Sequence, residues 1–199
     1  MKRFLINILL FIPLFTLAQD FLIKDLDNDK MNDSIIYNRK YSLIICKLSS
    51  QNFNKNQSEK IQFVNSESSG IQMTKSGFEF YNYQMREGYT CQFRFEKATE
   101  KIQLIGMTRY NNGNAELDGS GESSVNLLTK RYGGNWNYFD KKKIKLIKIA
   151  TINEKYTIPK TYLNEFSEKQ PEEYRIKCDK FYLKHKKTTA NRRLAQAGF

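Results

Sequence analysis

The chain has 199 residues, of which 33 are Lys or Arg and 21 are Asp or Glu, giving a formal net charge of +12. This length allows one domain with a substantial hydrophobic core, and the basic excess favours an anionic partner. Nucleic acid is not the expected partner, because the N-terminal segment indicates export from the cell.

The first residues have the features of a secretory signal peptide. Lys2 and Arg3 precede a mostly apolar run that ends at Leu17, and Ala18 is a small residue at the expected cleavage point. The run is shorter than the roughly 20 residues that span a membrane. We therefore expect cleavage, no transmembrane segment in the mature chain, and an exported protein that is periplasmic or secreted.

Just beyond the cleavage point, carboxylates alternate along a short segment. They are Asp25, Asp27, Asp29 and Asp33, at positions 1, 3, 5 and 9. A loop with this spacing can surround Ca²⁺ with oxygen ligands, and Met31 at position 7 can add its backbone carbonyl. Without a cation the crowded carboxylates would repel one another. We therefore predict a calcium site, with a solvated acidic turn as the alternative.

This segment resembles the calcium loops of FG-GAP and VCBS-type repeats, whose form is D-x-D-x-D-G-x-x-D before a short strand. The resemblance covers about residues 23–37, in which Ser34 to Tyr37 is a β-prone run. Lys30 departs from the pattern because it stands where the family has Gly. With no second copy in the sequence, the resemblance implies an exported bacterial protein with one such loop and no propeller of repeats.

The following chain alternates apolar and polar residues as antiparallel strands do. The alternation is uninterrupted from Cys91 to Glu96, and a polar turn leads into the apolar run Ile102 to Tyr110, so we predict a hairpin there. Other strands are predicted at residues 34–37, 41–48, 60–64, 71–74, 78–83, 123–129 and 143–152. The fold class is therefore all-β, a sandwich or curled sheet of mainly antiparallel strands.

Near the C-terminus we expect one short helix, at residues 161–170, where Thr161 can cap its first turn. Residues 172–183 fit a strand or a helix almost equally well, and we favour a strand. From Lys184 onward the chain is basic and polar, which predicts a disordered tail. The expected organisation is a signal peptide (1–18), a single β-rich domain (19–183) and a basic tail (184–199).

The basic excess belongs to the C-terminal third of the chain. Residues 20–140 hold 15 charges of each sign, whereas residues 141–199 hold 16 basic and 6 acidic ones. Such a region attracts anionic groups. The expected partner is an anionic polymer of the cell envelope or another protein, and the oligomeric state is left open.

Aromatic residues supply a second candidate binding site. Tyr132, Trp136 and Tyr138 could form a platform, because Tyr and Trp combine a flat apolar face with a polar group. Aromatic residues in β-proteins also serve as core, and this is the alternative interpretation.

Three cysteines, Cys46, Cys91 and Cys178, remain after export. An oxidising compartment permits one disulfide among them. The sequence does not select the pair.

Catalytic residues are hard to assign. The single histidine, His185, lies in the basic region, and no nucleophile or metalloprotease motif is found. A carboxylate pair for glycoside hydrolysis could come from Glu116, Asp118 and Glu122. We expect an exported, non-enzymatic, calcium-stabilised binding protein of the cell envelope. The alternatives are a periplasmic inhibitor or immunity protein against a cell-wall hydrolase, and a hydrolase that acts on polysaccharide.

Overall fold

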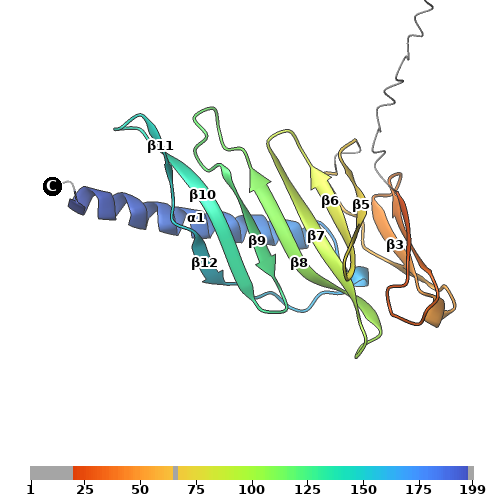
Figure 1. Ribbon diagram of the computed structural model, residues 1–199. Helices are drawn as coiled ribbons and strands as arrows, with labels where there is room; N and C mark the ends of the chain where they lie inside the picture. The colour runs from red at the N-terminus through yellow and green to blue at the C-terminus, as the bar shows by residue number, and fades with distance from the viewer. Residues whose placement is uncertain (1–19, 65–66, 197–199) are drawn as a thin grey trace, which may run out of the picture.

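The computed structural model describes residues 20–64 and 67–196, so the expected signal peptide lies outside the described residues. Within them, strands form two antiparallel sheets, and one α-helix, α1 (Lys169–Gln196), packs on the larger sheet (Figure 1). The strands are β1 (Phe21–Lys24), β2 (Asp33–Asn38), β3 (Leu43–Lys47), β4 (Lys55–Gln57), β5 (Ser69–Thr74), β6 (Gly77–Tyr83), β7 (Glu87–Glu96), β8 (Lys101–Asn111), β9 (Gly121–Asn126), β10 (Arg131–Asp140), β11 (Lys145–Lys148) and β12 (Ile152–Lys155).

The N-terminal sheet has the order β1-β2-β3-β4. In β2, Asp33, Ile35 and Tyr37 are buried and alternate with half-exposed residues, the pattern of a strand with one covered face. The Tyr37 ring packs against Phe80 of β6 with 5.2 Å between centroids. A single cluster of buried apolar side chains therefore spans both sheets and α1.

The larger sheet has the order β11-β10-β9-β8-β7-β6-β5, and its centre is the predicted hairpin, which the structure confirms as β7 and β8. The predicted strand at residues 143–152 is instead two strands. β11 pairs with Asn137–Asp140, and β12 pairs with Arg131–Gly134 on the same edge of β10. The predicted strand is thus interrupted between Lys148 and Ile152, and its two parts pair with different segments of β10.

Helix α1 crosses the sheet behind β8, β9 and β10, as Figure 1 shows. Its buried residues Tyr174, Cys178 and Phe181 recur at helical spacing and form a stripe toward the sheet. The opposite face of the sheet, which faces the viewer in Figure 1, carries no helix of the described chain. Within the described ranges no helix is both long enough and apolar enough to cross a membrane.

The structure confirms an all-β fold with one helix near the C-terminus, but the position of that helix differs from the prediction. Residues 161–170 contain a short 3-10 turn, Leu163–Glu165, and the start of α1. The prediction of a strand within residues 172–183 is wrong. These residues belong to α1, because only helical spacing places the aromatic side chains of this segment on one face toward the sheet. The predicted disordered tail is helical up to Gln196. Lys184 pairs with Glu154 of β12 and Lys186 pairs with Asp118 in the loop between β8 and β9, so the docked part of the helix extends into this region.

Candidate functional site

The loop between β1 and β2 brings three of the predicted calcium ligands together. Ligand atoms of Asp25, Asp27 and Asp29 all lie within 4.8 Å of one another. The loop curls around Asp25, whose carboxylate accepts hydrogen bonds from the backbone N–H groups of Asn28 at 2.7 Å and Lys30 at 3.0 Å. The alternating spacing therefore brings three of the predicted carboxylate ligands close together.

Lys30, at the glycine position of the pattern that the segment resembles, adopts a left-handed backbone conformation with φ of 73°. Asn28 does the same with φ of 66°. A residue with a Cβ costs roughly 1 kcal/mol in this conformation. The loop keeps the glycine-like geometry without the glycine, and its internal hydrogen bonds offset that cost.

Asp33 and Met31 lie outside the group of three. Asp33 is buried, and its carboxylate accepts hydrogen bonds from Leu26 N at 2.7 Å, Ser49 N at 2.8 Å and Ser49 Oγ at 3.0 Å. It therefore fastens the loop to the turn after β3. Met31 is exposed, and its N–H donates to Asp29 at 2.7 Å.

The predicted aromatic platform is part of the core, as the alternative interpretation held. Tyr132, Trp136 and Tyr138 expose at most 4% of their surface. They lie on the side of β10 that α1 covers, where Trp136 Nε1 donates to Tyr132 at 2.9 Å and the Tyr132 ring meets Phe181 at 4.8 Å. These side chains offer no surface for stacking a ligand.

Asp118 connects the loop between β8 and β9 to α1. Its carboxylate accepts hydrogen bonds from Phe139 N, Tyr182 Oη and Lys186 Nζ. Burial opposes the charged form, but the Lys186 ammonium and the Phe139 N–H hold the pKa of Asp118 below its usual value. Asp118 is thus a structural partner of α1.

His185 also belongs to the packing of α1, because its Nε2 lies 2.9 Å from a carboxylate oxygen of Glu154 on β12. Cys46, Cys91 and Cys178 are buried and unpaired. Burial raises the pKa of each thiol, so all three are poor nucleophiles at neutral pH.

The open face of the larger sheet carries a groove that the sequence did not reveal. Its floor is a row of small residues, Thr90, Thr108, Ser124 and Gly133, which are cross-strand neighbours from β7 to β10. The Thr90 and Thr108 hydroxyl oxygens lie 2.8 Å apart, and the hollow above this row has a volume of about 480 Å³.

Tyrosine rings border the floor of this groove. Tyr81 and Tyr83 stack with 5.1 Å between ring centroids, and Tyr110 follows at 5.9 Å from Tyr83. The Tyr110 ring lies directly over Gly88, where an added Cβ would come within 2.5 Å of the ring. The absence of a side chain at this position lets the ring lie close to the sheet.

A second hollow, of about 410 Å³, continues the groove toward the β8–β9 loop, and the two hollows share Tyr110, Glu122 and Asn135. The extension is lined by Asn111, Asn112, Ser120, Asn137 and Lys148. We call both hollows together the tyrosine groove. Its lining is mainly hydroxyl, amide and aromatic, and its charged members are Arg109, Glu122 and Lys148, of which Arg109 is paired with Glu87 and Asp179.

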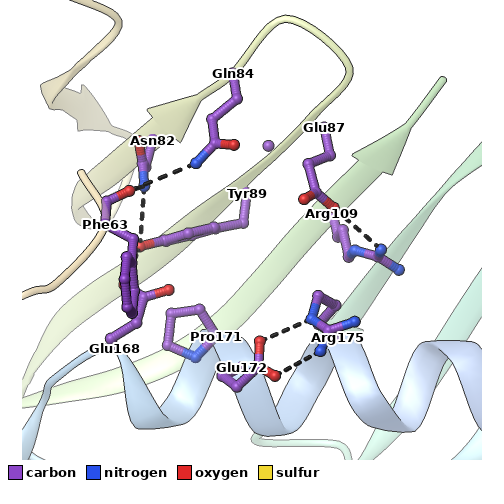
Figure 2. Close-up of a pocket in the computed structure, with 11 residues that line it drawn as sticks. Phe63, Asn82, Gln84, Glu87, Tyr89, Arg109, Glu168, Pro171, Glu172 and Arg175 are labelled. Atoms are coloured by element: carbon purple, nitrogen blue, oxygen red, sulfur yellow. Dashed lines mark hydrogen bonds and ion pairs between the residues drawn. The ribbon is translucent and has the colours of Figure 1, made fainter. Parts of the chain in front are cut away.

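A separate pocket of about 210 Å³ lies between β6, β7, β8 and the first turns of α1 (Figure 2). Glu168, just before α1, accepts a hydrogen bond from Tyr89 Oη at 2.7 Å at one end of it. Arg109 and Arg175 lie at the other end. We call this cavity the Glu168 pocket. Burial raises the pKa of Glu168 to about 7.

Comparisons with family models, curated proteins and solved structures found no match to this chain. The functional assignment therefore depends on the chemistry of these three sites.

Proposed function

We propose that this chain is an exported, non-enzymatic binding protein of the cell envelope, and that the tyrosine groove holds a glycan chain of an envelope polymer. The features of Met1 to Ala18 support export. The observation that carries the proposal is the groove itself, an aromatic rim beside a floor of hydroxyl and amide groups on the open sheet face.

Glycans match this lining chemically. A sugar ring has an apolar face of C–H groups, which packs against a flat aromatic ring such as Tyr83, and hydroxyl edges that need hydrogen-bond partners. Asn135 accepts a hydrogen bond from Thr151 at 2.9 Å, which leaves its amide nitrogen as a donor. The groove crosses four strands, about 14 Å at the usual strand spacing, so it suits an extended chain better than a single sugar.

The distribution of carboxylates favours binding over hydrolysis. Glycoside hydrolysis uses two carboxyl groups on either side of the scissile bond. Among the described residues that line the groove, Glu122 is the single carboxylate. The neighbouring Asp118 is engaged by Lys186 and Tyr182 on the helix side.

Calcium belongs to the same proposal as a stabilising ion. Asp25, Asp27 and Asp29 supply the oxygen ligands that Ca²⁺ prefers, on an exposed loop where water can complete the coordination. Bound Ca²⁺ would relieve the repulsion among the three carboxylates. It would thereby fix the connection between β1 and β2 and, through Asp33, the turn after β3.

Affinity electrophoresis and calorimetry test whether the groove binds glycans. The ligands are a panel of soluble neutral polysaccharides and peptidoglycan glycan strands. Tyr83→Ala and Asn135→Ala should each weaken binding about tenfold, equivalent to about 1.4 kcal/mol. Tyr41→Ala is the matched control, because Tyr41 is an exposed tyrosine outside the larger sheet.

Failure of every glycan to bind, or equal effects of Tyr83→Ala and Tyr41→Ala, would contradict the groove assignment. Tight one-to-one binding to a muramidase or amidase in place of glycan would favour an inhibitor of cell-wall hydrolases.

A second candidate interaction is with an anionic partner through the C-terminal half of α1. The sequence has no acidic residue after Asp179, whereas Lys180, Lys184, Lys186 and Lys187 follow it. In Figure 1 this end of the helix extends past the edge formed by β11 and β12. Its charge and position favour contact with an anionic envelope polymer or an acidic protein surface.

A further inference from the structure

The Glu168 pocket contains a carboxylate without a cationic partner. No ion pair of the described residues includes Glu168. Its hydrogen-bond donor is the neutral hydroxyl of Tyr89. A half-buried carboxylate satisfied by one neutral donor leaves negative charge facing the cavity, and such charge is costly unless a cation arrives.

The other charged groups of the pocket already compensate one another. Arg109 lies 3.0 Å from Asp179 and 3.4 Å from Glu87. Arg175 forms two hydrogen bonds with the Glu172 carboxylate, at 2.7 and 2.6 Å. The uncompensated charge is therefore confined to the Glu168 end, which fixes where a positive group would sit.

Aromatic and apolar groups surround that end. Phe63, 80% exposed, lies at the mouth, and Figure 2 shows it beside Tyr89 and Glu168, with Pro171 opposite. The Phe63 carbonyl accepts hydrogen bonds from Asn82 at 3.3 Å and Gln84 at 3.5 Å, so β6 and the residue that follows it hold this segment in place. Aromatic faces attract organic cations in addition to the attraction from the carboxylate.

From these contacts we infer that the Glu168 pocket binds the primary ammonium group of a small organic cation, with the ammonium on Glu168 and its carbon chain between Phe63, Tyr89 and Pro171. A cavity of about 210 Å³ limits the enclosed part to a small amine. A metal ion is the weaker fit, because the described residues hold a metal-type cluster at Asp25, Asp27 and Asp29 and not here. The inference is independent of the tyrosine groove.

Binding should depend on pH through Glu168. Its pKa is raised to about 7, chiefly by burial and also by the nearby Glu172, while the Tyr89 hydrogen bond lowers it. The remaining charged groups that line the pocket are Glu87, Arg109 and Arg175. An alkylamine stays protonated throughout this range, so affinity should fall about tenfold per unit as pH drops below the carboxyl pKa.

NMR titration with n-butylamine at pH 8 and pH 5.5 tests the inference. A parallel titration with 1-butanol provides a neutral analogue of the same shape. Butylamine should bind at pH 8 at least tenfold more tightly than butanol and lose most of that affinity at pH 5.5. Nα-acetyl-lysine amide, which keeps its side-chain ammonium, is tested in parallel and asks whether a lysine side chain of a partner protein can occupy the pocket in place of a free amine.

Glu168→Gln should abolish the preference for amine over alcohol, and Glu116→Gln, at an exposed carboxylate in the β8–β9 loop, should leave it unchanged. Folding of Glu168→Gln is checked by its amide spectrum. Equal binding of butylamine and butanol, affinity that does not change with pH, or full amine binding by Glu168→Gln would each overturn the inference.

Discussion

At the scale of single residues, the buried Asp33 and the half-buried Glu168 show how differently one fold can treat a carboxylate. Asp33 accepts hydrogen bonds from Leu26 N, Ser49 N and Ser49 Oγ. Glu168 accepts one from Tyr89. Donors that surround a carboxylate replace the water it loses on burial. Asp33 is therefore equipped for structure, whereas Glu168 is equipped for a further partner.

Glu168 should make folding stability depend on pH. Its folded-state pKa of about 7 lies above the ordinary 4.5, so the folded protein holds this proton more tightly than the unfolded chain does. Its contribution is fully present below pH 4.5 and is lost as pH rises to about 7. Glu168→Gln removes this titration. Between pH 4.5 and pH 8, the variant should therefore lose about 1–2 kcal/mol less unfolding free energy than the parent protein, allowing for solvent screening.

Urea denaturation of both proteins at the two pH values measures this difference. Glu116→Gln, which alters an exposed carboxylate, should reproduce the pH profile of the parent protein. A parallel profile for Glu168→Gln and the parent would contradict the assignment.

At the scale of elements, the Asp25–Asp33 loop should respond to Ca²⁺. A ligand at a hundred times its dissociation constant stabilises the folded state by about 2.7 kcal/mol, a rise of roughly 5–10 °C in Tm for a chain of this size. The double variant Asp27→Ala, Asp29→Ala should lose this rise, measured by thermal unfolding with Ca²⁺, Mg²⁺ or chelator. Asp33→Ala should instead lower Tm in chelator as well, because it leaves buried N–H donors unpaired.

Docking of α1 should depend on Tyr174 more than on any exposed apolar residue of the helix. Tyr174 is fully buried, packs edge-on against Tyr156 at 5.6 Å and hydrogen-bonds with Ser123 at 2.9 Å. Tyr174→Ala should cost about 3–5 kcal/mol of unfolding free energy, as large-to-small core changes do. Ile176→Ala, two residues away and 41% exposed, should cost under about 0.5 kcal/mol in the same urea titration.

The sequence predicted those elements whose signal is local. The period-two pattern of residues 91–96 and the polar turn after it specify a hairpin without knowledge of the rest of the chain. Residues 172–183 did not offer such a signal, because alternation and helical spacing fit them almost equally. The choice is made by the sheet, which provides an apolar surface for Tyr174, Cys178 and Phe181 together.

The same distinction explains which sites were predictable. The carboxylate loop is a run of neighbouring residues, so its spacing is visible in the sequence. The floor of the tyrosine groove joins Thr90, Thr108, Ser124 and Gly133 from four strands, and only the pairing register places them in a row. Glu168 and Tyr89 likewise meet across 79 positions.

At the scale of the whole molecule, the larger sheet separates two kinds of surface. One face is covered by α1 and carries the basic end of the chain, whereas the opposite face carries the nearly neutral tyrosine groove. A charged and an uncharged partner could therefore be held at once without competing for the same side chains. The two proposed interactions should differ in salt dependence, because screening weakens only the one between charged groups.

Binding of an anionic polymer should accordingly depend on charge at the C-terminal half of α1. Lys180→Glu combined with Lys187→Glu reverses two exposed charges there without removing the ion pairs of Lys184 and Lys186. We expect this variant to weaken binding to dextran sulfate at least tenfold at low salt, with the difference shrinking as NaCl approaches 0.5 M.

Lys55→Glu combined with Lys60→Glu is the matched control, since it makes the same change in net charge at exposed positions near the N-terminal sheet. If both double variants lose affinity equally, the attraction comes from net charge and not from α1. If the α1 variant alone loses it while glycan binding in the groove persists, the two faces of the sheet act as separate binding surfaces.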